Sequence, residues 1–85
     1  MSPFRVELSK KATNQLAAIW LRSTQRSAVT AAENRAAQRL ASTADSAGRD
    51  VSEGLYGLDE APLRFYYSIN FSQHVVVISD VYELR

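Results

Sequence analysis

The sequence contains no cysteine, only one histidine, and few residues that break regular structure: three glycines and two prolines among 85 residues. Without cysteine there is no disulfide framework, no thiolate metal site and no cysteine nucleophile, which fits a reducing, cytoplasmic location. A single histidine also argues against a transition-metal centre, so we expect neither a metal nor a cofactor. The scarcity of glycine and proline leaves no room for a linker, and we expect one domain over residues 1–85.

Long hydrophobic runs and an excess of one charge are also missing. The longest apolar runs are Leu16 to Leu21 and Val75 to Ile78, far shorter than the roughly 18 residues that a membrane span requires. Arg5 and Glu7 stand where a secretory signal would need apolar residues, so we expect no export signal. The net charge of +1 provides no strong attraction to nucleic acid or anionic lipid. These absences favour an ordinary globular domain with no membrane partner.

The first half of the chain predicts one strand followed by two helices. Residues 4–8 alternate between apolar and charged side chains, the period of a half-buried strand, and Ser9 is suited to cap a following helix. That helix is indicated by four apolar residues at helical spacing: Ala12, Leu16, Ile19 and Trp20. We expect Trp20 in the core for this reason. A second helix is expected over residues 27–47, with a buried face of Val29, Ala32, Ala36 and Leu40. We expect Gly48 to end this helix in the left-handed conformation.

The second half of the chain predicts three consecutive strands. Residues 51–58 indicate a weak or bulged strand because they include two glycines, and residues 59–62 have the composition of a turn. Residues 63–71 alternate strictly, which is a strong strand signal. A turn over residues 70–74 should hold His74 at the surface. Residues 75–82 are β-branched at most positions, as in a central strand covered on both faces.

The resulting order, βααβββ, predicts an α+β fold with a twisted, mainly antiparallel sheet and a two-helix hairpin on one face. The first strand must cross over through the helix pair. Two helices can cover only one side of a small sheet, so Arg64 and Tyr66 should lie on the uncovered face. Arg64 has the fork of donors that holds a phosphate or carboxylate, and Tyr66 can stack on a base or move a proton. In the alternative interpretation, Arg64 pairs with a neighbouring acid and Tyr66 only covers the sheet.

Two blocks of this sequence resemble the RelE/ParE-like superfamily of small bacterial toxins from type II toxin–antitoxin systems. The first block is Phe4 to Ser9, followed by Ala12 and Leu16 to Trp20, which is similar to the family's opening strand and helix. The second runs from Gly54 to Leu58 and from Pro62 to Ile69, and contains a pattern similar to the family's Leu-Arg-x-x-Tyr-x-Ile strand. The run Val75 to Ile78 fits the closing strand. The resemblance covers essentially the whole chain through the order and spacing of these blocks.

The resemblance implies a toxin that a cognate antitoxin holds inactive in a hetero-oligomer. Some members cleave mRNA on the ribosome, and others poison DNA gyrase without a known catalytic centre. Arg64 matches the strand arginine that contacts substrate phosphate in the ribonuclease branch. The basic cluster that precedes this strand in that branch has no match, because residues 51–63 contain no basic residue. The branch's closing strand usually ends in histidine, lysine or arginine and often continues into a helix bearing a tyrosine, whereas here it reads Ile78 to Arg85 and stops.

These departures favour a ParE-like toxin that binds and inhibits DNA gyrase, with a ribosome-dependent mRNA-cleaving toxin as the main alternative and a non-toxic antitoxin-binding partner as the third. We assign no catalytic residue. The candidates for target binding are Arg64, Tyr66, Arg49, Asp80 and Tyr82. In the ribonuclease alternative, the tyrosines would carry protons and Asp80 or Glu53 would act as the base. The candidates for antitoxin binding are Arg35, Arg39 and Trp20. The sequence leaves open whether Tyr82 or Val81 shares a face with Arg64.

Overall fold

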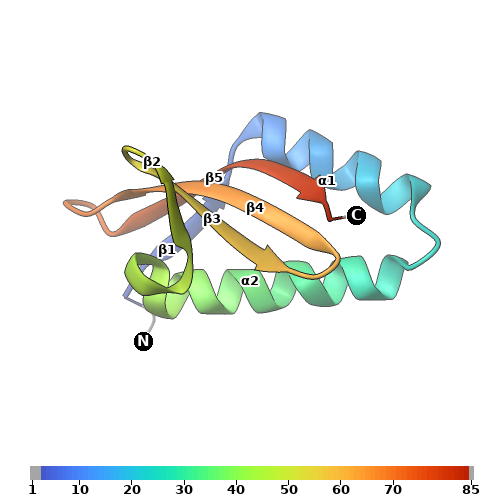
Figure 1. Ribbon diagram of the computed structural model, residues 1–85, viewed down its shortest axis with the longest axis horizontal. Helices are drawn as coiled ribbons and strands as arrows, with labels where there is room; N and C mark the ends of the chain where they lie inside the picture. Colours follow the sequence, from blue (N-terminus) through green and yellow to red (C-terminus); the bar gives the residue numbers. More distant parts are fainter. Residues whose placement is uncertain (1–2, 85) are drawn as a thin grey trace.

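The computed structural model describes residues 3–84, in which two helices lie against one face of a five-stranded β-sheet (Figure 1). The elements in chain order are β1 (Arg5–Leu8), α1 (Lys10–Arg22), α2 (Arg26–Ala47), β2 (Arg49–Ser52), β3 (Leu55–Glu60), β4 (Leu63–Asn70) and β5 (Val75–Glu83). Ser9 caps α1 as predicted, since its hydroxyl accepts a hydrogen bond from the amide of Ala12. Neither helix is long and apolar enough to span a bilayer within residues 3–84.

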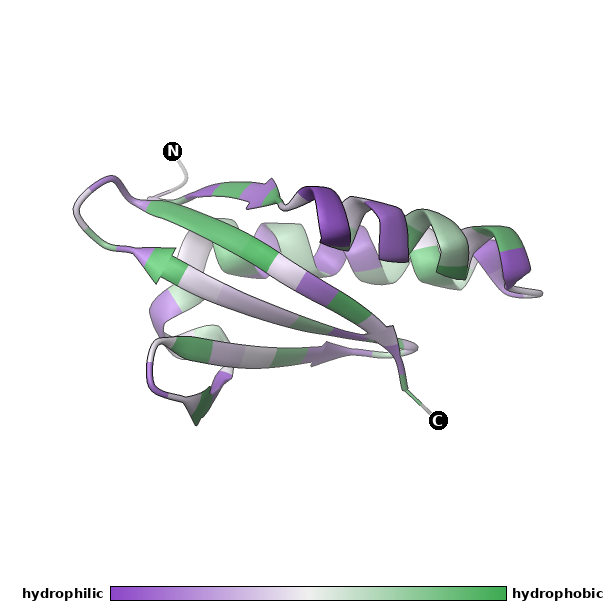
Figure 2. Cartoon of the chain, turned by 90° about the horizontal axis from the view of Figure 1, so that it is seen from above, coloured by the Kyte–Doolittle hydropathy of each residue, from purple (hydrophilic) through white to green (hydrophobic). Residues whose placement is uncertain are grey.

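The strand order in the sheet is β1-β5-β4-β3-β2. The pairs β2–β3, β3–β4 and β4–β5 are antiparallel, whereas β1 runs parallel to β5. The chain therefore crosses from β1 back to the sheet through both helices, as expected, and β5 lies between β1 and β4. Figure 2 shows both helices on the same side of the sheet. The predicted α+β fold class, with its helix hairpin on one face, is confirmed.

The segment over residues 51–58 differs from the prediction of one bulged strand. It is a β-hairpin formed by β2 and β3, with its turn at Glu53 and Gly54. Gly54 has a φ of +76°, a backbone conformation that side chains with a Cβ rarely adopt, and this reverses the chain direction. The sheet consequently has five strands rather than four. A register irregularity between Asp50 and Ser52 supplies the bulge that the sequence indicated.

Gly48 ends α2, but the predicted left-handed conformation is wrong: φ is −102° and ψ is −179°, which is extended backbone. The glycine is needed for packing instead. A Cβ at this position would collide with the phenol oxygen of Tyr67 and lie 2.7 Å from the carbonyl oxygen of Gly57. The end of α2 therefore lies directly against β3 and β4.

The core lies between the helices and the sheet. The alternation in β4 is as predicted, because Leu63, Phe65 and Tyr67 are fully buried while Arg64 and Tyr66 are only partly covered. The predicted buried face of α2 is also confirmed: Val29, Ala32, Ala36 and Leu40 are each at most 1% exposed. Since two of these residues are alanines, α2 packs close to the sheet.

Candidate functional site

The uncovered face of the sheet brings together residues from three neighbouring strands. Arg64 pairs in register with Tyr82 of β5, and Tyr66 pairs with Asp80. Residues directly opposite one another in a sheet project to the same side. Tyr82 and Asp80 therefore share a face with Arg64, whereas Val81 lies opposite Phe65 and is buried. The sequence did not determine whether Tyr82 or Val81 shares a face with Arg64, and the structure shows that Tyr82 does.

Arg64 is engaged by a carboxylate on the adjacent strand. Its Nε donates to Oδ1 of Asp59 at 2.6 Å and its Nη2 donates to Oδ2 at 3.0 Å, which is a bidentate pair. Nη1 of Arg49, from β2, lies 3.6 Å from the same Oδ2. The guanidinium of Arg64 is the main reason that the pKa of Asp59 lies below its ordinary value. The alternative interpretation, in which Arg64 pairs with an acid, describes the structure.

Asp59 was predicted to lie in a turn, and its pairing with Arg64 was not predicted. Asp59 and Arg64 stand at equal distances from the two-residue turn at Ala61 and Pro62, and they are register partners across the β3–β4 hairpin. If the strand predicted over residues 51–58 had been extended to Glu60, this pair would have been predicted, because the register of a hairpin follows from the length of its turn.

Two tyrosines, Tyr82 exposed and Tyr66 partly buried, form an aromatic surface beside this ion pair. The rings of Tyr66 and Tyr82 meet edge to face, with centroids 5.9 Å apart. Gly57 lies opposite Tyr66 in register, and a Cβ there would be 3.6 Å from the Tyr66 ring and 3.1 Å from a methyl carbon of Val51. Val51, Tyr66 and Tyr82 thus form a row across β2, β4 and β5, which we call the tyrosine row. Val51 and Tyr82 are 45% and 47% exposed.

Asp80 is also paired, with a cation from α1. Nζ of Lys11 lies 2.8 Å from its Oδ1, and the hydroxyl of Tyr82 donates to the same oxygen at 3.4 Å. The hydrogen bond from Lys11 lowers the pKa of Asp80, and the pKa of Lys11 is raised in turn. A carboxylate with a lowered pKa is a weaker base, so Asp80 is poorly suited to remove a proton from a 2′-hydroxyl.

The remaining chemical candidates lie apart from this cluster. Glu53 is exposed in the β2–β3 turn, and His74 is exposed in the turn before β5. His74 has a φ of +55°, and its ring is 6.1 Å from the ring of Phe4. Its predicted position at the surface is confirmed. Across residues 3–84, the structure groups no three histidine, aspartate or glutamate side chains as a metal site would require.

Arg35 and Arg39, predicted to meet an antitoxin, both hold Glu60 at the end of β3. Nε of Arg35 is 3.1 Å from Oε1 and Nη1 of Arg39 is 2.5 Å from Oε2. Their hydrogen bonds, chiefly that from Arg39, lower the pKa of Glu60. The Glu60 side chain is only 12% exposed, whereas the two arginines remain about half exposed. These arginines therefore fasten α2 to the sheet, and their role in binding a partner stays a prediction.

Trp20 is not a core residue, which corrects the prediction from the apolar stripe of α1. It is 41% exposed because the neighbouring Ile19, about 100° away around the helix, takes the buried position. The guanidinium carbon of Arg26 lies 4.7 Å from the centre of the Trp20 ring. Trp20 lines an apolar groove between the helices, the Trp20 groove, together with Thr13, Leu16, Ala17, Leu21, Thr30 and Glu33.

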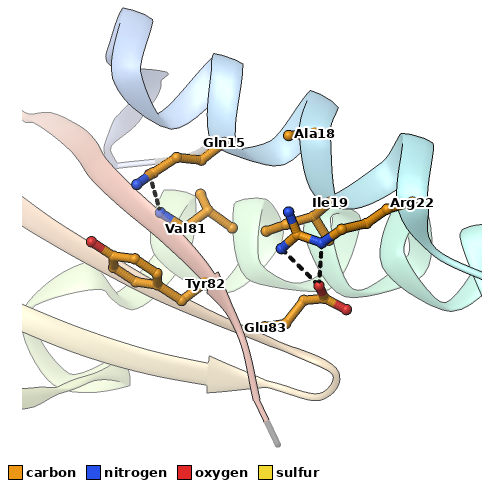
Figure 3. Close-up of a pocket in the computed structure, with 7 residues that line it drawn as sticks. All are labelled: Gln15, Ala18, Ile19, Arg22, Val81, Tyr82 and Glu83. Atoms are coloured by element: carbon orange, nitrogen blue, oxygen red, sulfur yellow. Dashed lines mark hydrogen bonds and ion pairs between the residues drawn. The ribbon is translucent and has the colours of Figure 1, made fainter.

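A second pocket lies between α1 and β5 (Figure 3). β1 pairs with β5 only as far as Ile78, so the edge of β5 is open beyond that residue. Two side chains hydrogen bond to the backbone of this open edge. Oε1 of Gln15, in α1, accepts from the amide of Val81 at 2.8 Å, and the hydroxyl of Ser9, the N-cap of α1, donates to the carbonyl of Ser79. Arg22 and Glu83 close the far end with a 2.8 Å ion pair. This edge is therefore already capped against addition of a strand.

Taken together, a β-strand, a helix hairpin and an antiparallel meander that pairs back onto the first strand define a small α+β domain with one exposed sheet face. This RelE/ParE-like fold is shared by three solved structures from toxin–antitoxin systems. A chain in the RelBE2 toxin–antitoxin complex from Mycobacterium tuberculosis superposes with a TM-score of 0.79 at 21% identity, covering 98% of this chain and 93% of that one.

The other two comparisons agree. The chromosomal ParDE system from P. aeruginosa gives a TM-score of 0.73 at 16% identity, with 96% and 97% of the two chains covered. The archaeal RelE–RelB complex from Pyrococcus horikoshii OT3 gives 0.63 at 18% identity, with 95% and 94% covered. No family model and no curated protein matches the sequence. The likeness thus rests on three-dimensional structure, and at these identities it establishes the fold.

Proposed function

We propose that the chain is the toxin of a type II toxin–antitoxin system and is neutralised by a cognate antitoxin in a hetero-oligomer. The three structures compared above come from toxin–antitoxin systems, two of RelE–RelB type and one of ParD–ParE type. The Trp20 groove supports the proposal from the chain itself. It exposes a tryptophan and a 66% exposed leucine, Leu21, on the outer side of the helix hairpin. Apolar anchors of this kind are typical of grooves that accept an amphipathic helix.

Within this class, we propose a ParE-like toxin that binds DNA gyrase rather than an enzyme that cleaves RNA. The observation that carries the preference is the bidentate pair between Arg64 and Asp59. Cleavage through a 2′-hydroxyl requires free cations for the phosphate and a base for the proton. Arg64 is neutralised by Asp59, and Asp80 is neutralised by Lys11. A gyrase-inhibiting toxin would also give the system a role in plasmid stabilisation.

The alternative, an mRNA-cleaving toxin that acts on the ribosome, is favoured by one feature. Arg64, Tyr66 and Tyr82 do lie on one face, where an arginine and two tyrosines could hold a phosphate and stack on bases. The two functions depend on different groups of the same residues. A protein-binding surface needs the aromatic rings of Tyr66 and Tyr82, whereas a nuclease needs a tyrosine hydroxyl and the charge of Arg64.

The test compares two purified systems. The chain is incubated with gyrase and supercoiled plasmid, and separately with ribosomes and mRNA, using wild type, Tyr66→Ala and Tyr82→Phe. We expect trapped gyrase–DNA cleavage complexes, weakened by Tyr66→Ala and retained by Tyr82→Phe, with intact mRNA. Position-specific cuts in mRNA that disappear with Tyr82→Phe would establish the alternative. Inactivity in both systems, together with harmless expression in cells lacking the antitoxin, would leave only a non-toxic antitoxin-binding partner.

A further inference from the structure

Asp59 occupies a central position among the cations of the uncovered face. It lies on β3 between β2, which carries Arg49, and β4, which carries Arg64. Both of its carboxylate oxygens accept hydrogen bonds from Arg64, and Oδ2 also faces Arg49 at 3.6 Å. One acid thus serves two arginines that come from different strands.

This arrangement leaves both arginines accessible, although the Nε and Nη2 donors of Arg64 are occupied by Asp59. The side chains of Arg64 and Asp59 are 32% and 36% exposed, and that of Arg49 is 54% exposed, so solvent and ligands can reach them. Arg64 holds Asp59 through Nε and Nη2, and the same two parallel donors would suit a phosphate. A phosphate that took this bidentate position would have to displace Asp59, and one that approached the remaining Nη1 donors would meet the negative charge of Asp59. Burial therefore does not keep phosphate away from this face, and the charge that opposes a phosphate here is the carboxylate of Asp59.

We propose that Asp59 is a selectivity residue of the uncovered face, which prevents Arg64 and Arg49 from holding the phosphates of a polynucleotide. The face then accepts a protein surface at the tyrosine row and rejects single-stranded RNA. The inference rests on the proposed function, because it assumes that the uncovered face binds the target. It goes further by naming the residue that determines the chemical class of that target.

A latent polynucleotide site follows from the same geometry. Without the charge of Asp59, two guanidinium groups would converge on one point of the sheet. Tyr66, two residues beyond Arg64 on the same side of β4, lies next to that point and could stack on a base. Asp59→Asn removes the charge while keeping the size of the side chain and its capacity to hydrogen bond. The variant should therefore bind RNA more tightly than the wild type does.

The experiment measures binding of a short, fluorescently labelled single-stranded RNA by anisotropy, at low and at moderate salt. Asp59→Asn is compared with the wild type and with Asp45→Asn, which removes one negative charge from α2. Because the donors of Arg64 become free to make a charged hydrogen bond to phosphate, we expect Asp59→Asn to bind the RNA about tenfold more tightly than the wild type. The salt dependence should steepen by about 0.7 in log–log slope for each arginine that gains a phosphate contact. Asp45→Asn should stay close to the wild type, and adding Arg64→Ala to Asp59→Asn should abolish the gain.

Equal gains for Asp59→Asn and Asp45→Asn would overturn the inference, since net charge alone would then explain them. An unchanged affinity in a folded Asp59→Asn variant, checked by its circular dichroism melt, would overturn it as well. If that variant does not fold, the wild type and Arg64→Ala decide the matter: equal RNA affinity supports the inference, and a loss on Arg64→Ala contradicts it. None of these readouts involves gyrase or an antitoxin. Failure of the selectivity role is therefore distinguishable from failure of the proposed function.

Discussion

The phenol of Tyr67 donates a hydrogen bond of 2.8 Å to the carbonyl oxygen of Ala44, which joins the middle of β4 to the last turn of α2. Tyr67 is fully buried, and its burial raises the pKa of the phenol. The contact serves one of the carbonyl groups that the end of a helix leaves without an internal partner. It also explains why Gly48, the next residue after α2, must lack a side chain.

Replacing Tyr67 with phenylalanine should remove this hydrogen bond and leave the carbonyl of Ala44 without its partner. We expect the free energy of unfolding to fall by about 1 to 2 kcal/mol, the usual cost of a buried donor lost in this way. Differential scanning calorimetry measures it as a decrease in Tm of several degrees. Tyr82→Phe, at an exposed tyrosine on the uncovered face, is the matched control. Equal losses for the two variants would contradict the account of α2's anchoring.

Gly48→Ala should destabilise the fold because the added methyl group would meet both the phenol oxygen of Tyr67 and the carbonyl of Gly57. We expect a loss of about 1 to 3 kcal/mol in the free energy of unfolding, as for other overpacked sites. In Gly48→Ala combined with Tyr67→Phe, the phenol oxygen is absent, so the two losses should not add. Urea denaturation of the single and double variants measures the coupling. Strict additivity would show that the close approach of these two residues is unimportant.

The stability of the fold should decrease in acid, partly through Glu60. Arg39 and Arg35 hold the pKa of Glu60 below its ordinary value, so the folded state binds its proton less readily than the unfolded state. This contribution to the free energy of unfolding is complete above the unfolded pKa of about 4.3 and disappears as the pH falls through the lower folded pKa. Glu60→Gln should therefore be less stable than the wild type at neutral pH, with a gap that narrows in acid.

Urea denaturation at a series of pH values checks this expectation. Glu53→Gln, at an exposed turn residue, removes the same charge and serves as the control. A gap between wild type and Glu60→Gln that stays constant from neutral pH into acid would contradict the role assigned to the two arginines.

Trp20 provides a direct probe of the proposed antitoxin binding because it is the sole tryptophan and is 41% exposed. Binding of a partner in the Trp20 groove should move the fluorescence of Trp20 to shorter wavelength as its ring leaves water. Trp20→Ala should weaken antitoxin binding by about 2 kcal/mol, the size typical of an interfacial tryptophan. Phe71→Ala, at an exposed aromatic residue in the turn after β4, should leave the affinity unchanged. A spectrum unchanged on binding would place the antitoxin elsewhere.

The fold could be predicted from the sequence wherever hydrophobic periodicity was strong. The alternation in residues 63–67 and the alanine-rich face of α2 both indicated the correct buried residues, because each side of these elements meets a single environment. The alternating run fails at its end, where Phe71 lies in the turn after β4 and is 55% exposed. Trp20 was misplaced because its neighbour Ile19 competes for the same buried direction, and spacing alone does not say which of the two faces the sheet. Gly48 was explained wrongly because its neighbour in space, Tyr67, is distant in the chain.

The candidate site was only half predictable for a related reason. The sequence placed Arg64 and Tyr66 on the uncovered face from the period of one strand. Their partners depend on the register between strands, which the turn lengths set, and so Asp59 and Glu60 were missed. The side of β5 that carries Tyr82 was also undetermined, since residues 75–78 are apolar at every position. The irregular register between Tyr66 and Tyr67 shifts the two strands by one residue.

The uncovered face is proposed to be a protein-binding surface centred on the tyrosine row. The most direct measurement is the affinity of the purified chain for DNA gyrase by surface plasmon resonance, with Tyr66→Ala and the distant Phe71→Ala compared in parallel. We expect the wild type and Phe71→Ala to bind equally and Tyr66→Ala to bind at least about tenfold more weakly, as for a central aromatic anchor. Equal binding by all three proteins, or no binding to gyrase alongside tight binding to ribosomes, would contradict the account.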